Sequence, residues 1–452
     1  MSFTNFITQL GAAGAGGLSY WIASFNVSST GVPWVSTVRE FSNGEILITG
    51  NLALTGSGAE PFAARLSSTD GSIIWSKRLR GPVAAAYKIE NAQLTGSHID
   101  SSDNVYLQFS DYNGSYAGFM SLNSNGTTRW SGNAYWYNKS RTLASCLLGN
   151  DADIYSIGST TGIQSGYRGL ITQWDTSNGD FQADRALTGI TNYAYGGDIN
   201  GSTIIMTGYG NYFAYSHATV KQTVANSLST SGSETGIRYS SANVRGRDVA
   251  IDSSGNVYVV CSVLTGNSPW AIYKLNSSLN SISWQKYYEP AGTTNASNVG
   301  HPSLQISSDN RLFVMNSYEV GSDKRNLVAE INTSNGNVIW ANGLGVSGKT
   351  YLPCSVNGYT FKFLIHSDES VIYPVFDLNG VFHLLKVPMD GSLMGTYGNY
   401  SYSSVSIGYN TGISASLIPD YVGWSTSGDD QTGFDSTQNT TYSISQTDIE
   451  TL

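Results

Sequence analysis

Charged residues are scarce in this chain of 452 residues: they make up 12% of it, about half the share of an ordinary soluble domain. Glycine, serine, threonine, asparagine and tyrosine are abundant instead, so we expect a neutral, polar surface. The formal net charge is −9, and no run of basic residues occurs. We therefore expect no nucleic-acid partner and no binding to an anionic membrane surface, because both require a basic patch.

Cysteine is also rare. Cys146, Cys261 and Cys354 are odd in number, far apart, and embedded in apolar or strand-like sequence. This is typical of small buried hydrophobic residues in a protein made in a reducing compartment, and not of a disulfide framework. No stretch is long and apolar enough to cross a membrane, and the N-terminus lacks the charged and apolar regions of a signal peptide. We expect neither export nor membrane insertion.

Signatures of catalysis and metal binding are missing as well. No HExxH, Cys-x-x-Cys or G-x-S-x-G motif occurs, and the five histidines are far apart in the sequence. These are His98, His217, His301, His366 and His383. Turns such as Asp252-Ser-Ser-Gly-Asn lack the alternating ligands and terminal glutamate of a calcium loop, so their Asp and Asn are expected to cap turns. The sequence predicts no metal site, no cofactor and no catalytic residue; a hydrolase is the least favoured function.

What the chain does contain is a repeated unit, seen most clearly over residues 244–290. It predicts four short strands, RDVAID, NVYVVCSV, WAIYKL and SISWQKY, with turn residues between them. The run from Val257 to Val263 is apolar at nearly every position, so this strand should be covered on both faces. A repeated four-stranded sheet of this length is the blade of a β-propeller.

One tight turn marks the repeat, between the third and fourth strands of each unit. Asn-Gly and Asp-Gly supply the positive φ that such a turn requires. The turn recurs every 48 to 56 residues, at Asp70-Gly71, Asn125-Gly126, Asn178-Gly179, Ser231-Gly232, Leu279-Asn280, Asn335-Gly336 and Asp390-Gly391. Four residues later several units have a tryptophan, which should be a buried anchor of the fourth strand: Trp75, Trp130, Trp284 and Trp340.

Seven units are recognisable, and the segments that flank them suggest how the array closes. The units cover residues 40–80, 92–136, 142–188, 193–238, 244–290, 300–345 and 358–400. Residues 19–37 resemble the second half of a unit, and residues 402–418 could supply its two inner strands. Pairing the two would close a propeller and leave no free sheet edge. The prediction is an all-β propeller, with eight blades favoured and seven blades with accessory terminal strands as the alternative.

The two ends of the chain differ in composition from the repeats. Residues 1–18 form an arm in which Phe3, Phe6, Ile7 and Leu10 have the spacing of one face of a short helix. These four residues are the predicted docking site, either on the propeller itself or on a neighbouring subunit. The propeller is expected over residues 19–424. Residues 425–452 contain few large apolar groups, and their Asp429, Asp430 and Asp435 fit a solvated, extended tail.

Tyrosine is frequent, with 29 residues, and it gathers near the boundaries between units. The clusters are Tyr135-Trp136-Tyr137-Asn138, Tyr193-Ala-Tyr195, Tyr209-Gly-Asn-Tyr-Phe and the segment from Tyr397 to Tyr402. Aromatic rings beside amide and hydroxyl groups suit the binding of sugars or of protein surfaces. The alternative is that these rings cover the edges of the blades.

The arm, the SYWIASF segment and the IDSSGNVYVVCSV repeats together resemble β-propeller structural proteins of tailed bacteriophages, particularly marine ones, over about residues 3–400. The resemblance implies a non-enzymatic virion protein, made in the host cytoplasm and associated with the tail, its fibre or its tip. Expected partners are other tail or capsid proteins, copies of the chain itself and a host-surface glycan. The alternatives are a capsid decoration protein and a bacterial surface carbohydrate-binding propeller.

Overall fold

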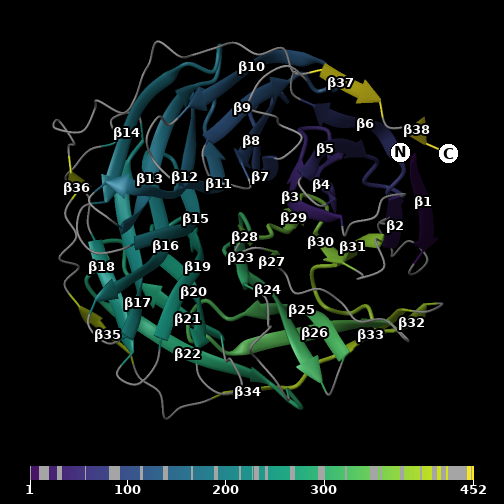
Figure 1. The fold of residues 1–452 in the computed structure, drawn as a ribbon. Helices are drawn as coiled ribbons and strands as arrows, with labels where there is room; N and C mark the ends of the chain where they lie inside the picture. Colours follow the sequence, from purple (N-terminus) through teal and green to yellow (C-terminus); the bar gives the residue numbers. More distant parts are fainter. Residues whose placement is uncertain are drawn as a thin grey trace.

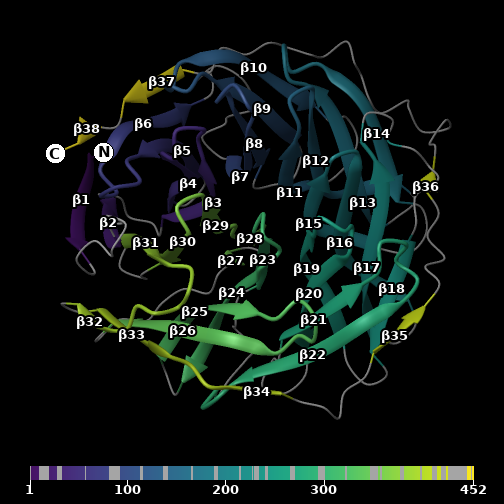
Figure 2. The ribbon, with the colours of Figure 1, turned by 180° about the vertical axis from the view of Figure 1, so that it is seen from behind.

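The computed structural model is a ring of seven β-sheets around a common axis, which is a β-propeller (Figures 1 and 2). Every regular element of the described residues is a strand. The structure describes residues 2–9, 20–27, 33–55, 58–80, 92–111, 116–135, 141–163, 166–187, 192–212, 215–225, 228, 234–239, 243–264, 270–293, 301–320, 323–346, 355–356, 359–376, 381–397, 400–409, 415–418, 424–425, 445–448 and 450–451. Among these residues no helix is long and apolar enough to span a bilayer.

Six blades are each a continuous four-stranded meander, with the first strand innermost. Blade 1 is β3 (Trp34–Glu40), β4 (Ile46–Thr55), β5 (Gly58–Leu66) and β6 (Ile73–Arg80), and blade 2 is β7 (Ala92–Ile99), β8 (Val105–Asp111), β9 (Tyr116–Leu122) and β10 (Thr128–Tyr135). Blade 3 is β11 (Arg141–Gly149), β12 (Asp153–Ile163), β13 (Gly166–Asp175) and β14 (Phe181–Leu187), and blade 4 is β15 (Asn192–Asn200), β16 (Thr203–Tyr212), β17 (Tyr215–Val224) and β18 (Glu234–Tyr239). Blade 5 is β19 (Asn243–Ile251), β20 (Val257–Leu264), β21 (Trp270–Leu275) and β22 (Ile282–Pro290), and blade 6 is β23 (Ser303–Ile306), β24 (Leu312–Val320), β25 (Asp323–Ile331) and β26 (Val338–Val346).

Blade 7 closes the ring by combining the two ends of the repeat array. Its three inner strands are β29 (Leu364–His366), β30 (Ser370–Phe376) and β31 (Val381–Pro388), and its fourth strand is the N-terminal β2 (Trp21–Val27). The favoured count of eight blades is therefore wrong, and the alternative of seven is confirmed. Residues 19–37 do not supply one half-blade, because β2 is the fourth strand of blade 7 whereas β3 is the innermost strand of blade 1.

The N-terminal arm is a strand and not the short helix that its apolar spacing predicted. β1 (Ser2–Gln9) pairs antiparallel with β2 from Phe3 opposite Val27 to Gln9 opposite Trp21. The backbone groups of β1 thereby gain hydrogen-bond partners along the edge of the sheet. An isolated helix of two turns would be only marginally stable in water.

The C-terminal segment runs back around the ring along the outer edges of the blades, visible as the yellow strands at the rim of Figure 1. We call its strands the rim strands: β33 (Tyr400–Ser404) with β32 (Gly395–Tyr397) on blade 6, β34 (Ile407–Tyr409) on blade 5, β35 (Ala415–Ile418) on blade 4, β36 (Trp424–Ser425) on blade 3, β37 (Ser445–Asp448) on blade 1 and β38 (Glu450–Thr451) on β1. The described strands within residues 402–418 thus cover outer edges, and none of them is an inner strand of a blade. Their short pairings satisfy exposed backbone groups of the fourth strands.

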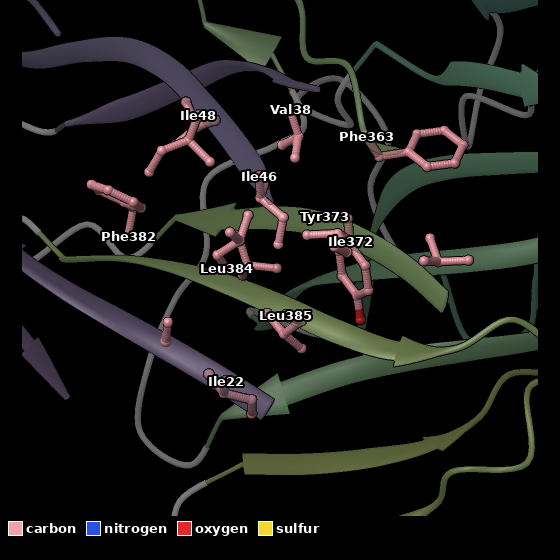
Figure 3. Packing of buried hydrophobic residues seen from close by; sticks show 14 of the residues in the cluster. Ile22, Val38, Ile46, Ile48, Phe363, Ile372, Tyr373, Phe382, Leu384 and Leu385 are labelled. Atoms are coloured by element: carbon pink, nitrogen blue, oxygen red, sulfur yellow. The ribbon is translucent and has the colours of Figure 1, made fainter. Parts of the chain in front are cut away.

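The propeller core lies between neighbouring sheets, as the all-apolar middle strand predicted. In β20, Val259 and Cys261 belong to the cluster shared with blade 4, whereas Tyr258 and Val260 belong to the cluster shared with blade 6. Alternate residues of one strand therefore fill two different interfaces. Figure 3 shows part of the cluster that joins blade 7 to its neighbours, where Ile22 of β2 lies beside Leu385, its partner on β31.

The repeated Asp-Ser-Ser motif caps the turn between the first and second strands. Asp252 accepts hydrogen bonds from the backbone amides of Ser254 (3.0 Å) and Asn256 (2.8 Å), and its other oxygen accepts one from the hydroxyl of Tyr258 (3.1 Å). Asp100 accepts the same set, from Ser102, Asn104 and Tyr106. The repeat is explained by this local geometry, and no group of three or more candidate metal ligands occurs in the part of the chain that the structure describes.

In blades 1, 2, 5, 6 and 7 a tryptophan of the fourth strand joins the blade to the next one. Trp130 of blade 2 donates its indole N–H to the Thr176 carbonyl of blade 3 (3.0 Å), and its ring lies where a Cβ on Gly179 would be. The same arrangement of a tryptophan against a turn glycine of positive φ recurs as Trp21 with Gly71, Trp75 with Gly126, Trp284 with Gly336 and Trp340 with Gly391. The glycines of the repeated turn therefore meet two requirements: they adopt the positive φ of the turn, and they leave room for the tryptophan ring of the neighbouring blade.

Replacing Gly179 by alanine should lower the free energy of unfolding by about 2–5 kcal/mol, because strain at positive φ adds to overpacking. An added Cβ would lie 2.5 Å from the Trp130 ring, at a φ of +78°. Gly201→Ala is the matched control, since Gly201 has a φ of +57° with no atom within 4 Å of the added Cβ. Urea unfolding of both variants separates the two effects; equal losses would show that Trp130 does not restrict this position.

Candidate functional site

The innermost strands carry a β-bulge at corresponding positions. In blades 1 to 5 the register of the first strand shifts by one residue, between Val35 and Thr37 in β3 and between Ala194 and Gly196 in β15, for example. The residue that the ladder skips is Ser36, Thr95, Ser145, Tyr195 or Arg247, in blade order. A bulge re-aims the side chain of the extra residue, so blades 4 and 5 each present a large polar group there.

These two bulges are the centre of a group that we call the tyrosine–arginine cluster: Tyr193, Tyr195 and Tyr209 of blade 4, Arg245 and Arg247 of blade 5, and His301 just before β23 of blade 6. The Tyr193 and Tyr209 rings stack with centroids 4.7 Å apart, and Tyr195 lies 5.7 Å from Tyr209. The two guanidinium groups lie on this stack, Arg245 over Tyr209 at 4.5 Å and Arg247 over Tyr195 at 4.8 Å. His301 lies 6.2 Å from Tyr195.

The two arginines of the cluster differ in exposure and in role. Arg247 is 3% exposed and donates from Nε to the Ser262 hydroxyl (3.1 Å). Burial lowers the pKa of Arg247 to about 10, so it stays protonated at neutral pH. Burial also raises the pKa of Tyr195, an effect that Arg247 partly opposes, and the phenol remains a hydrogen-bond donor. Arg247 therefore fixes the Tyr195 ring while adding positive charge.

Arg245 is the group of the cluster that can take a ligand. It is half-buried, its Nε finds no acceptor, and no carboxylate pairs with it among the described residues. A guanidinium over an aromatic ring can still donate hydrogen bonds to a planar anion such as a carboxylate. The six residues of the cluster include no carboxylate or thiol, so what this arrangement can do is bind an anionic group beside aromatic surfaces.

A part of the chain that the sequence did not single out lies near the middle of the ring (Figure 1). β27 (Ser355–Val356) and β28 (Tyr359–Thr360) form a hairpin there. The following Lys362 exchanges backbone hydrogen bonds with β3, through the Ser36 carbonyl (3.0 Å) and the Val38 amide (3.2 Å). Its ammonium group forms an ion pair with Asp248 of β19.

Asp248 is fully buried and well partnered. One carboxylate oxygen accepts hydrogen bonds from the Ser303 hydroxyl (2.8 Å) and the Leu304 amide (2.9 Å), and the other pairs with Lys362. Nearby Asp198 accepts from the Ile251 amide (2.8 Å); burial raises the pKa of Asp198, and that hydrogen bond and Lys362 oppose the rise. The arrangement joins blades 1, 5 and 6 across the channel, a structural use of charges that sequence position alone could not reveal.

The predicted docking residues occupy different situations. Phe3, Phe6 and Ile7 all lie in β1, opposite Val27, Ser24 and Ala23 of β2. The Ile7 side chain is 39% exposed. Leu10 lies outside the described residues. A docking role for this arm stays a prediction, on a strand in place of a helix.

The structure keeps the histidines apart. His98 lies in β7, His217 in β17, His366 in β29 and His383 in β31, and only His301 joins the tyrosine–arginine cluster. His98 is buried, and burial lowers its pKa to about 4. Of the tyrosine groups seen in the sequence, Tyr193, Tyr195 and Tyr209 converge, whereas Trp136, Tyr137 and Asn138 lie outside the described residues.

No family model matches this chain, and no curated protein does. Solved structures of similar shape include the quinohemoprotein alcohol dehydrogenase from Comamonas testosteroni, with 8% identity and a TM-score of 0.42 over 80% of this chain and 75% of that chain. Others are Drosophila Semaphorin 1b extracellular domains 1-2, with 10% identity and a TM-score of 0.42 over 81% and 86%, and the N11 neuraminidase-like protein of A/flat-faced bat/Peru/033/2010, with 11% identity and 0.43 over 73% and 96%. These likenesses carry no argument about function.

Proposed function

We propose that this chain is a non-enzymatic structural protein of a tailed-phage particle, associated with the tail, its fibre or its tip, and that its tyrosine–arginine cluster binds a carboxylated sugar of the host surface. The observation that carries the binding function is the half-buried Arg245, which stacks on Tyr209 at 4.5 Å and has no carboxylate partner among the described residues. The particle assignment is supported by the sequence resemblance and by the scarcity of charge.

The geometry fits an acidic sugar in two respects. A uronic-acid carboxylate would receive hydrogen bonds from the Arg245 edge, and aromatic rings beside it suit the apolar face of a pyranose. All inner strands begin on the same face of the ring, because four antiparallel strands return the chain to the face from which it started. The cluster lies towards the N-terminal ends of β15 and β19, so a surface polymer could reach it on that face.

Arg245→Gln should weaken binding of a uronic-acid oligosaccharide, such as a polygalacturonate or alginate fragment, by about ten- to a hundredfold, since a hydrogen bond to a charged group contributes about 1.5–3 kcal/mol. Calorimetric titration or glycan-array binding measures the change. Lys286→Gln is the matched control, because Lys286 of blade 5 is also a cation over a tyrosine ring, 5.1 Å from Tyr409 of the rim strand β34, but lies outside the cluster. Equal affinities of Arg245→Gln and the unaltered protein would refute this binding site.

The particle assignment has its own test. Immunogold labelling of purified phage with an antibody against this chain, together with mass spectrometry of the particles, should place it at the tail. Label over the head would favour capsid decoration, and absence from particles would refute the assignment in favour of the bacterial surface alternative.

A further inference from the structure

A second site, separate from the tyrosine–arginine cluster, lies between blades 5 and 6. It is a pocket of about 350 Å³, at the small end of the range for ligand sites. Its lining includes Trp270 at the start of β21, Glu289 near the end of β22, Thr293 and Tyr318. The rim strand β34 and the residue before it complete the wall, with Gly408 and Ser406. Three segments far apart in the sequence therefore build this pocket.

Trp270 is an unusual wall residue, because its polar atom lacks a partner. Its side chain is 2% exposed and stacks on Tyr288 with centroids 4.2 Å apart and planes 12° apart. The stack fixes the orientation of the indole. The buried Nε1 donor finds no acceptor in the described part of the chain. A buried donor without a partner costs about 1–3 kcal/mol, so an acceptor from a ligand in the pocket would recover free energy there.

Glu289 supplies the opposite kind of group. It is exposed, and no cation pairs with its carboxylate among the residues that the structure describes. A carboxylate accepts hydrogen bonds only, whereas an indole N–H donates only. The Thr293 hydroxyl, also in the lining, already donates to the Pro290 carbonyl (2.6 Å) but keeps acceptor capacity.

This combination selects the chemistry of the ligand. An anion would be repelled by Glu289, an ammonium group could not accept from the Trp270 N–H, and an apolar molecule would bury both polar groups without partners. A hydroxyl group both donates and accepts, so several on one small ring could satisfy the two sides together. The aromatic rings of Trp270 and Tyr318 suit the C–H surfaces of such a ring. We infer that the pocket binds one uncharged pyranose unit.

The site stands on its own geometry and does not depend on the tyrosine–arginine cluster. Pro290, Trp270 and Val320 mark strand ends on the face where the inner strands begin, so the pocket and the cluster are on the same face. The rim strand holds its part of the wall through pairing of Glu289 with Gly408 and through the hydrogen bond from the Ala291 amide to the Ser406 carbonyl (2.8 Å). The wall is thus already in place before a ligand arrives.

The test follows the indole N–H resonances of the ¹⁵N-labelled full chain during titration with glucose, galactose, mannose and N-acetylglucosamine. At least one of these sugars should shift the Trp270 resonance in a saturable way. Trp270→Phe, which keeps a ring on Tyr288 but removes the donor, and Glu289→Gln should each weaken that binding at least tenfold. Trp284→Phe is the matched control in the same blade, since its N–H is already donated to the Thr333 carbonyl (2.9 Å), and it should leave the affinity unchanged.

Two results would overturn the inference. The first is that none of the four sugars shifts the Trp270 resonance at a concentration roughly 50 times the Kd of an ordinary millimolar lectin site, where binding would be saturated. The second is binding that neither Trp270→Phe nor Glu289→Gln weakens. Because Glu289 is exposed, Glu289→Gln should fold even if Trp270→Phe does not, so the binding of Glu289→Gln alone can still contradict the inference.

Discussion

Removing residues 1–27 should leave no cooperatively folded monomer, whereas removing residues 1–19 should leave the ring intact. The difference is β2, the fourth strand of blade 7. Trp21, Ile22 and Phe25 in this strand are at most 1% exposed, and Phe25 stacks on Phe382 with centroids 4.6 Å apart. Truncating one buried Trp or Phe side chain costs about 3–5 kcal/mol, so losing the whole strand should exceed a typical stability of about 5–15 kcal/mol.

β2 also joins blade 7 to blade 1. The Trp21 indole donates to the Ser68 carbonyl (3.1 Å), and its ring lies against Gly71. Without β2, the ring would lose both a strand and an interface, and β31 would be left as an unpaired apolar edge. Circular dichroism melting and size-exclusion chromatography of the two deletions test this prediction, and Phe25→Ala provides a milder change of about 3–5 kcal/mol.

A control at the other end of the chain separates ring closure from general loss of pairing. Removing residues 424–452 takes away β36, β37 and β38, which add short pairs outside complete blades. We expect this deletion to fold, and a synthetic peptide of residues 18–30 to restore a cooperative transition to the chain that lacks residues 1–27. If that chain melts cooperatively within a few degrees of the full protein, β2 does not close the ring.

The architecture of the blades could be predicted from the sequence, because turn glycines, apolar middle strands and repeated tryptophans are local signals. The number of blades could not. The sequence of two short apolar strands separated by a loop is the same kind of pattern whether the strands form a hairpin or belong to two blades. β2 and β3 belong to two blades, 7 and 1. The alternation in residues 402–418 fits an inner strand and a rim strand equally well, since both need only one partner edge to be satisfied.

The candidate site was only half visible in the sequence. Tyr193, Tyr195 and Tyr209 stand out as aromatic residues near a unit boundary. Arg245 and Arg247 begin the next unit, and their place over these rings depends on the bulges of two neighbouring inner strands. A partial signal did exist, since two arginines lie within three residues here, a spacing that recurs in this chain at Arg78 and Arg80. Its meaning required knowledge of which blade faces which.

The same limit applies to Lys362 and Asp248, which are 114 residues apart and pair across the channel. Lys362→Met should lower the free energy of unfolding by about 3–5 kcal/mol, because it leaves a buried carboxylate without its cation. The side chain of Asp248 is 0% exposed and that of Lys362 is 9% exposed, so water cannot readily replace the lost partner. Urea unfolding at neutral pH measures the loss.

Asp248→Leu should cost more than Lys362→Met, since it also leaves the Ser303 hydroxyl and the Leu304 amide without their acceptor. The double variant should lose less stability than the sum of the two single losses, because no unpaired charge remains.

Glu45→Gln is the control. The Glu45 side chain, which pairs with Arg65, is 29% exposed, so removing this ion pair should cost at most about 1 kcal/mol. A Lys362→Met loss no larger than that of Glu45→Gln would mean that the ion pair does not hold this segment in place. The packing of Phe361 and Phe363, which are buried on either side of Lys362, would then be what fixes it.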